Sequence, residues 1–375
     1  MAVRRLFDVA FDSSSDEDNV PVRRPRWIRE RSQHFDDFDD LDFETRFRLS
    51  KESALDVLSQ IEDKLEFPTD RNHAVSPMNQ LLCALRFYAT GSDQLSAADF
   101  GGFSKSTAHR IVHRVSGAIA SLYKTHIVFP ERNNEIMRTQ AGFYRIASFP
   151  KVIGAIDCTH IKIKSPGGQN AEIFRNRKGY FSLNVQAICN SNLEFLDIVA
   201  RWPGSSHDST IFNNCYRRAL FEEGRFENSV LVGDSGYACR SYMMTPLDTA
   251  RTPQEQLYNE SQIRTRNPIE RTFGIWKRRF PAMALGMQVH WEKTFPIIVA
   301  TAVLHNILRR AGEGLPRDDP DLNIPAPWDV LMQQGEMGNL VQAEGGRRVH
   351  QNHQDRLNLV ENYFGRMARN NERAR

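Results

Sequence analysis

The stretch VIGAIDCTHIKIK, residues 152–164, decides the fold of this chain. It opens on an apolar run and then alternates, which predicts one or two β-strands after Pro150. FSLNVQAICN (181–190) predicts a further strand. LEFLDIVARWPG (193–204) is predicted to form its hairpin partner across Asn190-Ser191-Asn192. A sheet with a buried centre is therefore expected in the middle of the chain.

The elements that follow complete the fold class. A helix is expected from near His207-Asp208 to about Phe221, and SVLVGDSGY (229–237) predicts a buried strand ending in a turn. Two long helical stretches come next: Glu255 to Phe280, expected to be broken at Pro268, and FPIIVATAVLHNILRRAG (295–312). Three antiparallel strands followed by a parallel one is the ribonuclease-H-like order. We therefore predict an α/β fold with a mixed sheet flanked by helices over residues 145–312.

A small all-α domain is predicted before the sheet, over residues 45–125. SPMNQLLCALRFYATG (76–91) has Ser76 as N-cap and Pro77 at the first helical position. Residues 95–119 predict two short helices around a Gly-Gly turn, the second capped by Ser104. This spacing is typical of a helix-turn-helix, and an ordinary helical hairpin shares it. The exposed basic residues of the second helix are the predicted DNA contacts there: Lys105, Arg110 and Arg114.

Both ends of the chain differ from its middle in composition. Residues 1–44 carry a net charge of −5 against +8 for the rest, and they predict a disordered charged tail. The segment VRRPRWIRER (22–31) has the composition of a nuclear-localisation or phosphate-binding segment, and equally of a solvated tail. Residues 313–375 predict a linker rich in Pro, Asp and Gly, followed by a last helix in RLNLVENYFGRM (356–367).

Composition also indicates the compartment. No apolar run is long enough to cross a bilayer, and the N-terminus has no apolar core of a secretory signal. The five cysteines are widely spaced and never form a C-x-x-C pair, which predicts free thiols rather than disulfides or a zinc site. They are Cys83, Cys158, Cys189, Cys215 and Cys239. A location in the reducing interior of the cell is expected, and the basic body favours a nucleic-acid partner over a membrane.

Four acidic residues stand where a metal site would need them. Asp157 and Asp234 each follow an apolar run, so both are expected to project from a buried strand, where an unpaired charge is costly. Glu270 lies in the helical NPIERTFGIWKRRF (267–280). Asp208 begins a predicted helix, where an aspartate also serves as an ordinary dipole partner. Hard cations such as Mg²⁺ take carboxylate oxygens, and two of them in one site can cleave a phosphodiester. We predict a divalent-metal site, Mg²⁺ or Mn²⁺, at these four acids.

Basic residues near the predicted site are the expected phosphate contacts there. They are Lys162, Lys164, Arg175, Arg177, Lys178 and Lys277.

At these motifs the chain resembles the Harbinger transposase-derived nucleases, relatives of the PIF/Harbinger DDE transposases. The shared motifs are GAIDCTHIKIKSP, NRKGYFSLNVQAIC, RWPGSSHDS, VGDSGY with MTPL after it, NPIERTFGIWKRRF and AVLHNI, over about residues 76–309. The resemblance implies a catalytic triad of Asp157, Asp234 and Glu270, with Asp208 as a further metal ligand. It also implies DNA as substrate, a separate Myb/SANT-like DNA-binding partner, and location in the nucleus and also the cytoplasm.

Two other classes of function stay open at this point. The first is a domesticated, catalytically silent DNA-binding or regulatory protein that keeps the basic surface alone. The second is a phosphatase-like hydrolase with Asp157 as nucleophile, although Thr159 stands where such enzymes have a second aspartate. The residues also do not separate a mobile transposase from a host nuclease.

Overall fold

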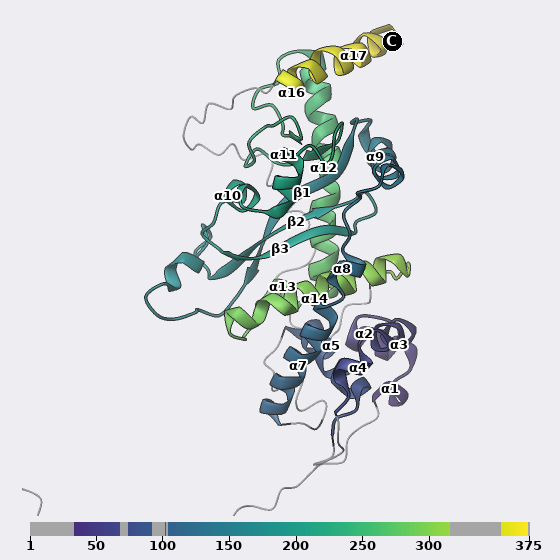
Figure 1. The fold of residues 1–375 in the computed structure, drawn as a ribbon, viewed down its shortest axis with the longest axis vertical. Coiled ribbons are helices and arrows are strands. Elements are labelled where there is room, and N and C mark those ends of the chain that lie inside the picture. The colour runs from purple at the N-terminus through teal and green to yellow at the C-terminus, as the bar shows by residue number, and fades with distance from the viewer. Residues whose placement is uncertain (1–33, 68–73, 92–101, 103, 316–353, 374–375) are drawn as a thin grey trace, which may run out of the picture.

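A mixed β-sheet flanked by helices forms the body of the protein, with a group of helices from the N-terminal region packed below it (Figure 1). The computed structural model describes residues 34–67, 74–91, 102, 104–315 and 354–373. This architecture confirms the predicted ribonuclease-H-like fold with preceding helices. In the described part of the chain, no helix is both long and apolar enough to span a bilayer.

The sheet has five strands in the order β3-β2-β1-β4-β5. Their bounds are β1 (Val152–Lys162), β2 (Ser182–Cys189), β3 (Phe195–Pro203), β4 (Val230–Val232) and β5 (Met243–Met244). β1 pairs antiparallel with β2, and β2 with β3, whereas β4 lies parallel to β1. The predicted strand order is confirmed. β5 was not predicted, because two residues carry no periodicity.

Both faces of the sheet are covered, which explains why every residue of β2 is buried. Neighbouring residues of β1 point to opposite faces: Ala155 joins the larger hydrophobic cluster and Ile156 the smaller one. The larger cluster contains apolar residues of α12 (Pro253–Arg279) and α14 (Trp291–Arg310). The smaller one contains those of α10 (Asp208–Asn213) and α11 (Tyr216–Glu222). The sheet is therefore sandwiched between these two pairs of helices.

The N-terminal helices share the larger hydrophobic cluster with the sheet. They are α1 (His34–Asp37), α2 (Asp40–Phe47), α3 (Lys51–Ser59), α4 (Glu62–Leu65), α5 (Pro77–Thr90), α7 (Lys105–Ala120) and α8 (Tyr123–His126). The predicted N-caps Ser76 and Ser104 are confirmed, and Gly91 ends α5 in the left-handed conformation. The first helix of the predicted helix-turn-helix lies outside the described residues. α14 runs between this group and the sheet, against α7 and β3 (Figure 1).

The remaining elements surround the sheet. They are α9 (Asn133–Ala147), the 3-10 turn η1 (Ala171–Phe174), α13 (Ala282–Leu285), and the C-terminal α16 (Gln354–Asn358), η2 (Leu359–Phe364) and α17 (Gly365–Arg373). The C-terminal helical segment confirms the predicted last helix. It packs on the start of α12, where Phe364 contacts the rings of Phe149 and Tyr258.

Three sequence predictions need correction. The tail predicted to be disordered up to residue 44 is folded from His34, and Phe43 is fully buried because its ring packs into the core. The helix predicted from 207 to 221 is two helices, interrupted between Asn213 and Tyr216. Pro268 does not break its helix. α12 continues through it over 27 residues, and buried residues that pack in the core lie both before and after Pro268. The five cysteines are free, as predicted.

Asn306 of α14 ties the helix to two other segments. Its Oδ1 accepts the N–H of Phe195 at 2.8 Å, and its Nδ2 donates to the carbonyls of Phe195 and His126 at 2.7 and 2.9 Å. The side chain is fully buried. It therefore satisfies backbone groups that water cannot reach.

We expect Asn306→Ala to lower the free energy of unfolding by about 2–4 kcal/mol, because it leaves buried backbone groups unpaired. Urea denaturation measures this. Asn192→Ala, which truncates an exposed side chain in the β2–β3 turn, should change stability by less than about 0.5 kcal/mol. Equal stability of the two variants would contradict the role given to Asn306.

Candidate metal centre

The register of β1 and β4 places two aspartates side by side. The last residues paired between these parallel strands are Ala155 and Val232. Asp157 and Asp234 each lie two residues further along. Side chains alternate with a period of two, so both point to the sheet face that Ala155 and Val232 cover, toward α12. The parallel register thus converts two separate strand motifs into one acidic pair.

Asp208 reaches the same point from α10, of which it is the first residue. The buried Asn184 of β2 donates from Nδ2 to Asp208 Oδ1 at 2.9 Å and to the carbonyl of Ser206 at the same distance. One amide thereby holds both the helix start and its carboxylate. Carboxylate oxygens of Asp157, Asp208 and Asp234 all lie within 4.8 Å of one another. We call these three residues the aspartate cluster.

The aspartate cluster fits a hard divalent cation. Its donors are carboxylate oxygens from three separate elements, each partly exposed rather than sealed from solvent. Backbone N–H groups orient two of the carboxylates: Cys158 donates to Asp157 Oδ1 at 2.7 Å and Gly236 to Asp234 Oδ1 at 2.9 Å. The opposite oxygen of Asp157 pairs with Arg266, whereas no hydrogen bond to the opposite oxygen of Asp234 occurs among the described residues, so that oxygen can contact a cation. Such a set of oxygen donors is the kind that a hard divalent metal takes.

Burial and like charge disfavour the ionised forms of the cluster, although Arg266 lies beside it. Burial raises the pKa of Asp157, and the nearby Asp234 carboxylate raises it further. Burial also raises the pKa of Asp234, with a smaller contribution from Asp208. Proximity of like charges and desolvation both disfavour the ionised forms. A bound cation would remove that penalty.

Glu270 lies beside the aspartate cluster rather than within it. Arg266, one turn earlier on α12, pairs with Glu270 Oε1 through Nη2 at 2.5 Å and with Asp157 Oδ2 through Nη1 at 2.9 Å. The Arg266 side chain is only 5% exposed. One buried guanidinium therefore bridges two of the four predicted ligands. The helix break predicted at Pro268, two residues before Glu270, does not occur, because α12 is continuous there.

Three of the predicted phosphate contacts lie close to the cluster. Arg177 Nη2 lies 2.6 Å from Nδ1 of His207, the residue before Asp208. Lys277 donates to the carbonyl of His160 at 3.0 Å, and burial lowers its pKa to about 8. The charge of Lys178 contributes to lowering the pKa of both Lys277 and His160. These cations thus form one basic rim beside the cluster.

The other predicted contacts lie further out. Lys162, Lys164 and Arg175 are exposed, and Arg175 is paired with Glu172 at 2.7 Å. Lys105 and Arg110 are exposed on α7, in the N-terminal helical part. Arg114 donates to the carbonyls of Lys64 and Glu66 and lies over the ring of Phe67, so it has a structural role. As DNA contacts, all of these stay predictions.

Two residues of the site were missed from the sequence. Arg266 had a visible signal, because it stands four residues before Glu270 and so shares its helix face. Asn184 had none: it is one of three alternating polar residues of β2, with Ser182 and Gln186, and only the tertiary structure shows that it holds Asp208.

Comparison with known proteins places this core in a family. The family model described as DDE superfamily endonuclease matches residues 156–306. The chain is 36% identical over 246 residues to proteins named Putative nuclease HARBI1 from Bos taurus and Homo sapiens, covering 65% of this chain and 70% of each relative. It is 24% identical over 315 residues to the Arabidopsis thaliana protein Antagonist of Like Heterochromatin Protein 1, covering 78% and 79% of the two chains. No solved structure matches the chain significantly.

We expect Mn²⁺ to raise the melting temperature of the protein. At a concentration one hundred times its Kd, the metal should increase the free energy of unfolding by about 2.7 kcal/mol. Asp157→Asn and Asp234→Asn should abolish this rise. They should also stabilise the metal-free protein, because each removes one of the repelling charges. Differential scanning fluorimetry with and without metal is the measurement, and Asp248→Asn, an exposed aspartate, is the control. An undiminished response in both cluster variants would refute the site.

Arg266→Met should destabilise the metal-free protein by about 3–5 kcal/mol, because Asp157 and Glu270 lose their shared counterion in a partly buried site. Mn²⁺ should restore more stability to this variant than to the wild type, since the metal supplies the missing positive charge. Urea denaturation in EDTA and in Mn²⁺ gives both values. Arg266→Lys keeps the positive charge but loses the planar guanidinium group. Its free energy of unfolding should lie between those of the wild type and Arg266→Met.

Proposed function

The chain belongs to the Harbinger transposase-derived nuclease family, and on that premise we propose that it is a divalent-metal-dependent nuclease that cleaves DNA phosphodiester bonds. The observation that carries this proposal is the aspartate cluster. Three elements that are far apart in sequence bring carboxylate oxygens within 4.8 Å of one another, inside the region that matches the DDE endonuclease model.

The role proposed for each residue follows from its position. Divalent cations, when bound, polarise the phosphate and activate a water nucleophile. Asp157, Asp208 and Asp234 would hold them. Glu270 completes the family triad from α12. It is separated from the aspartate cluster by the guanidinium group of Arg266, which pairs with both Glu270 and Asp157. The phosphodiesterase proposal is favoured over a covalent aspartyl phosphatase, because Asp157 lies among other carboxylates that would repel a phosphate unless cations separate them.

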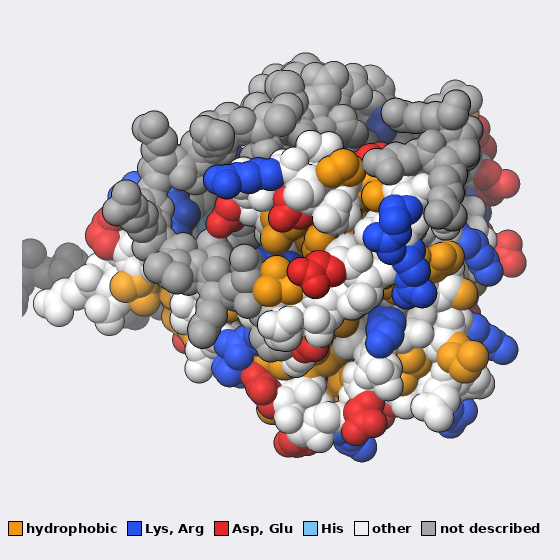
Figure 2. All heavy atoms as spheres, turned by 90° about the horizontal axis from the view of Figure 1, so that it is seen from above, with side chains coloured by type: hydrophobic (Ala, Val, Ile, Leu, Met, Phe, Trp, Pro, Cys, Tyr) orange, Lys and Arg blue, Asp and Glu red, His pale blue; other side chains and the backbone are white. Residues whose placement is uncertain are grey.

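The basic rim beside the cluster supports DNA as the substrate. Arg177, Lys178 and Lys277 surround His160 and the start of α10, where they can contact phosphates next to the one being cleaved. Elsewhere charges are mixed: on the face in Figure 2, a short line of Lys and Arg side chains lies at the right, and Asp and Glu side chains are scattered among the other described residues. DNA binding is therefore expected to depend on a few local cations.

Two further parts of the proposal concern the cellular setting. A DNA substrate favours the nucleus as the place of action, with the cytoplasm as the place of synthesis. A separate Myb/SANT-like DNA-binding protein is proposed as a partner, in keeping with the family. The basic segment 22–31 that would serve nuclear import lies outside the described residues.

The second candidate is a DNA-binding regulatory protein without catalysis. One observation favours it: a relative that matches most of this chain is named for antagonising a heterochromatin protein rather than for a nuclease. The two candidates differ in whether the aspartate cluster is needed for chemistry or only for structure. The four acids are all present, which favours the nuclease.

We expect Asp157→Ala, Asp208→Ala and Asp234→Ala to lose nicking of supercoiled plasmid in Mn²⁺ below detection. Glu270→Ala should be nearly as severe. Asp208, whose position at a helix start also suits an ordinary dipole partner, ranks with the other aspartates, because its carboxylate lies in the cluster. All four variants should bind DNA in a gel-shift assay, since binding depends on the basic residues.

Glu260→Gln is the matched control, because Glu260 is exposed on the same helix as Glu270 and pairs only with Arg264 among the described residues. It should nick DNA as the wild type does. If the purified wild type binds DNA but never nicks it in Mg²⁺ or Mn²⁺, the regulatory candidate replaces the nuclease. Full activity of Glu270→Ala would remove Glu270 from the triad.

A further inference from the structure

A shallow depression with a volume of about 470 Å³ lies between the β2–β3 turn and the helices α12 and α14. Residues 191–194 of the turn form one wall. Arg271 of α12 and the consecutive Arg309 and Arg310 of α14 form the other. Three arginines face a single glutamate, Glu194, so the depression carries positive charge. None of the functions assigned above uses these arginines.

The turn that forms the wall is held rigidly. The Asn190 side chain accepts the N–H groups of Asn192 and Glu194 at 2.9 and 3.0 Å, and Leu193 adopts a left-handed conformation with φ of 65°. The buried His305 of α14 hydrogen-bonds the Leu193 carbonyl at 2.7 Å. Such a frame fixes the arginines that are attached to it.

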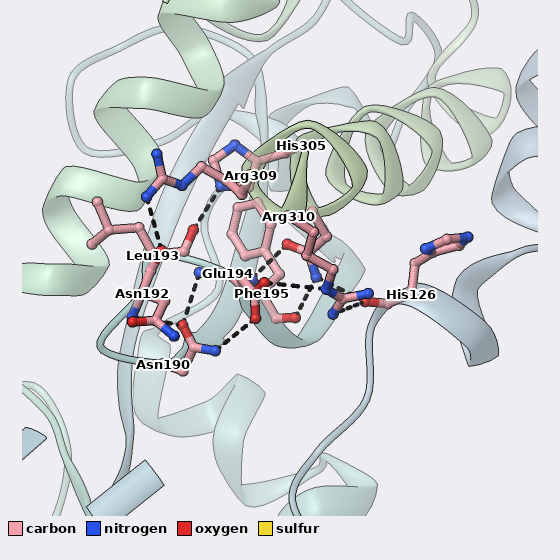
Figure 3. Close-up of polar contacts among 10 residues, drawn as sticks. His126, Asn190, Asn192, Leu193, Glu194, Phe195, His305, Arg309 and Arg310 are labelled. Carbon is pink, nitrogen blue, oxygen red and sulfur yellow. Dashed lines mark hydrogen bonds and ion pairs between the residues drawn. The ribbon is translucent and has the colours of Figure 1, made fainter. Parts of the chain in front are cut away.

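Arg309 and Arg310 extend from α14 in different directions (Figure 3). Arg309 Nη2 donates to the Asn192 carbonyl at 3.2 Å, while Arg310 pairs with Glu194 at 3.1 Å and donates to the His126 carbonyl at 2.9 Å. Glu194, the acid in the depression, thus forms its ion pair with Arg310. Arg309 is oriented by a neutral carbonyl, its Nε is buried without a hydrogen-bond partner among the described residues, and its charge is not neutralised.

Arg271 adds a second unmatched cation. It is exposed, and no hydrogen bond or ion pair to it occurs among the described residues. It directly follows Glu270, so its Cα lies about 3.8 Å from that of a metal-centre residue. The side chains of the two residues leave α12 about 100° apart, one toward the metal centre and the other into the depression.

We propose that this depression binds a phosphate of the DNA backbone through Arg271 and Arg309, beside the strand that is cleaved. Two guanidinium groups beside a polar turn are suited to a phosphodiester, because the planar fork matches phosphate oxygens. A helix with its side chains is about 10–12 Å wide, and one DNA strand carries a phosphate every 3.4 Å along the axis. DNA bound at the metal centre therefore brings neighbouring backbone phosphates within reach of Arg271 and Arg309. This inference rests on the proposed nuclease function.

The test is a fluorescence-anisotropy titration of a labelled DNA duplex at salt concentrations between about 50 and 200 mM. Arg271→Gln and Arg309→Gln should each weaken binding and make the slope of log K against log salt shallower by about 0.9, the value for one phosphate contact. Arg271→Gln is the decisive variant, because an exposed side chain without described partners can be replaced without loss of folding. The stabilisation by Mn²⁺ should be unchanged in it.

Arg264→Gln is the matched control, an exposed arginine on the same helix that pairs with Glu260. It should leave the affinity and the slope unaltered. The inference is overturned if Arg271→Gln keeps the wild-type slope, or if Arg264→Gln lowers it equally, since binding would then be diffuse. Binding of inorganic pyrophosphate is measured in parallel. The inference is also overturned if Arg271→Gln abolishes pyrophosphate binding but leaves DNA binding intact, because the depression would then bind a small anion and not the DNA backbone. A wild type that binds no DNA contradicts the proposed function itself.

Discussion

Carboxylates brought together on a partly buried sheet face repel one another unless a positive charge stands between them. This constraint organises the protein around Asp157. The parallel register of β1 and β4 sets Asp157 beside Asp234, Asn184 adds Asp208, and Arg266 supplies the nearest internal cation. The apo protein thus meets the constraint with one arginine that serves two acids. A metal would meet it more completely, since a divalent ion carries twice the charge and accepts several oxygens at once.

The helix α12 turns this local arrangement into a functional surface. Its buried residues pack on the sheet, and its start is covered by the C-terminal helical segment, so its register over the sheet is well determined. Along it lie the bridging Arg266, the acid Glu270, the exposed Arg271 and the buried Lys277. Because Pro268 leaves the helix continuous, these residues keep helical spacing and cannot move independently. Any movement of Glu270 toward the cluster therefore requires Arg266 to release it.

Most of the fold was predictable because it depends on local periodicity. The apolar runs of β1, β2 and β4 and the caps at Ser76 and Ser104 are local signals, and the pairing of β2 with β3 follows from the short turn between them. Failures arose where distant contacts outweigh such signals. Pro268 disfavours a helix locally, but packing against the sheet keeps α12 intact. The acidic segment around Phe43 has the composition of a disordered tail, yet one buried aromatic pair, Phe43 and Phe47, anchors it.

The four acids and the family can be recognised from the sequence, since both depend on residue types at characteristic spacings. The spatial arrangement of the acids depends on the tertiary structure. That structure showed that Asp157, Asp208 and Asp234 form one cluster while Glu270 is held by Arg266, and that Arg271 and Arg309, 38 positions apart, line one depression. The physical reason is that charge interactions fall with distance in space and not along the chain. Strand register and helix packing set those distances, and a sequence states neither.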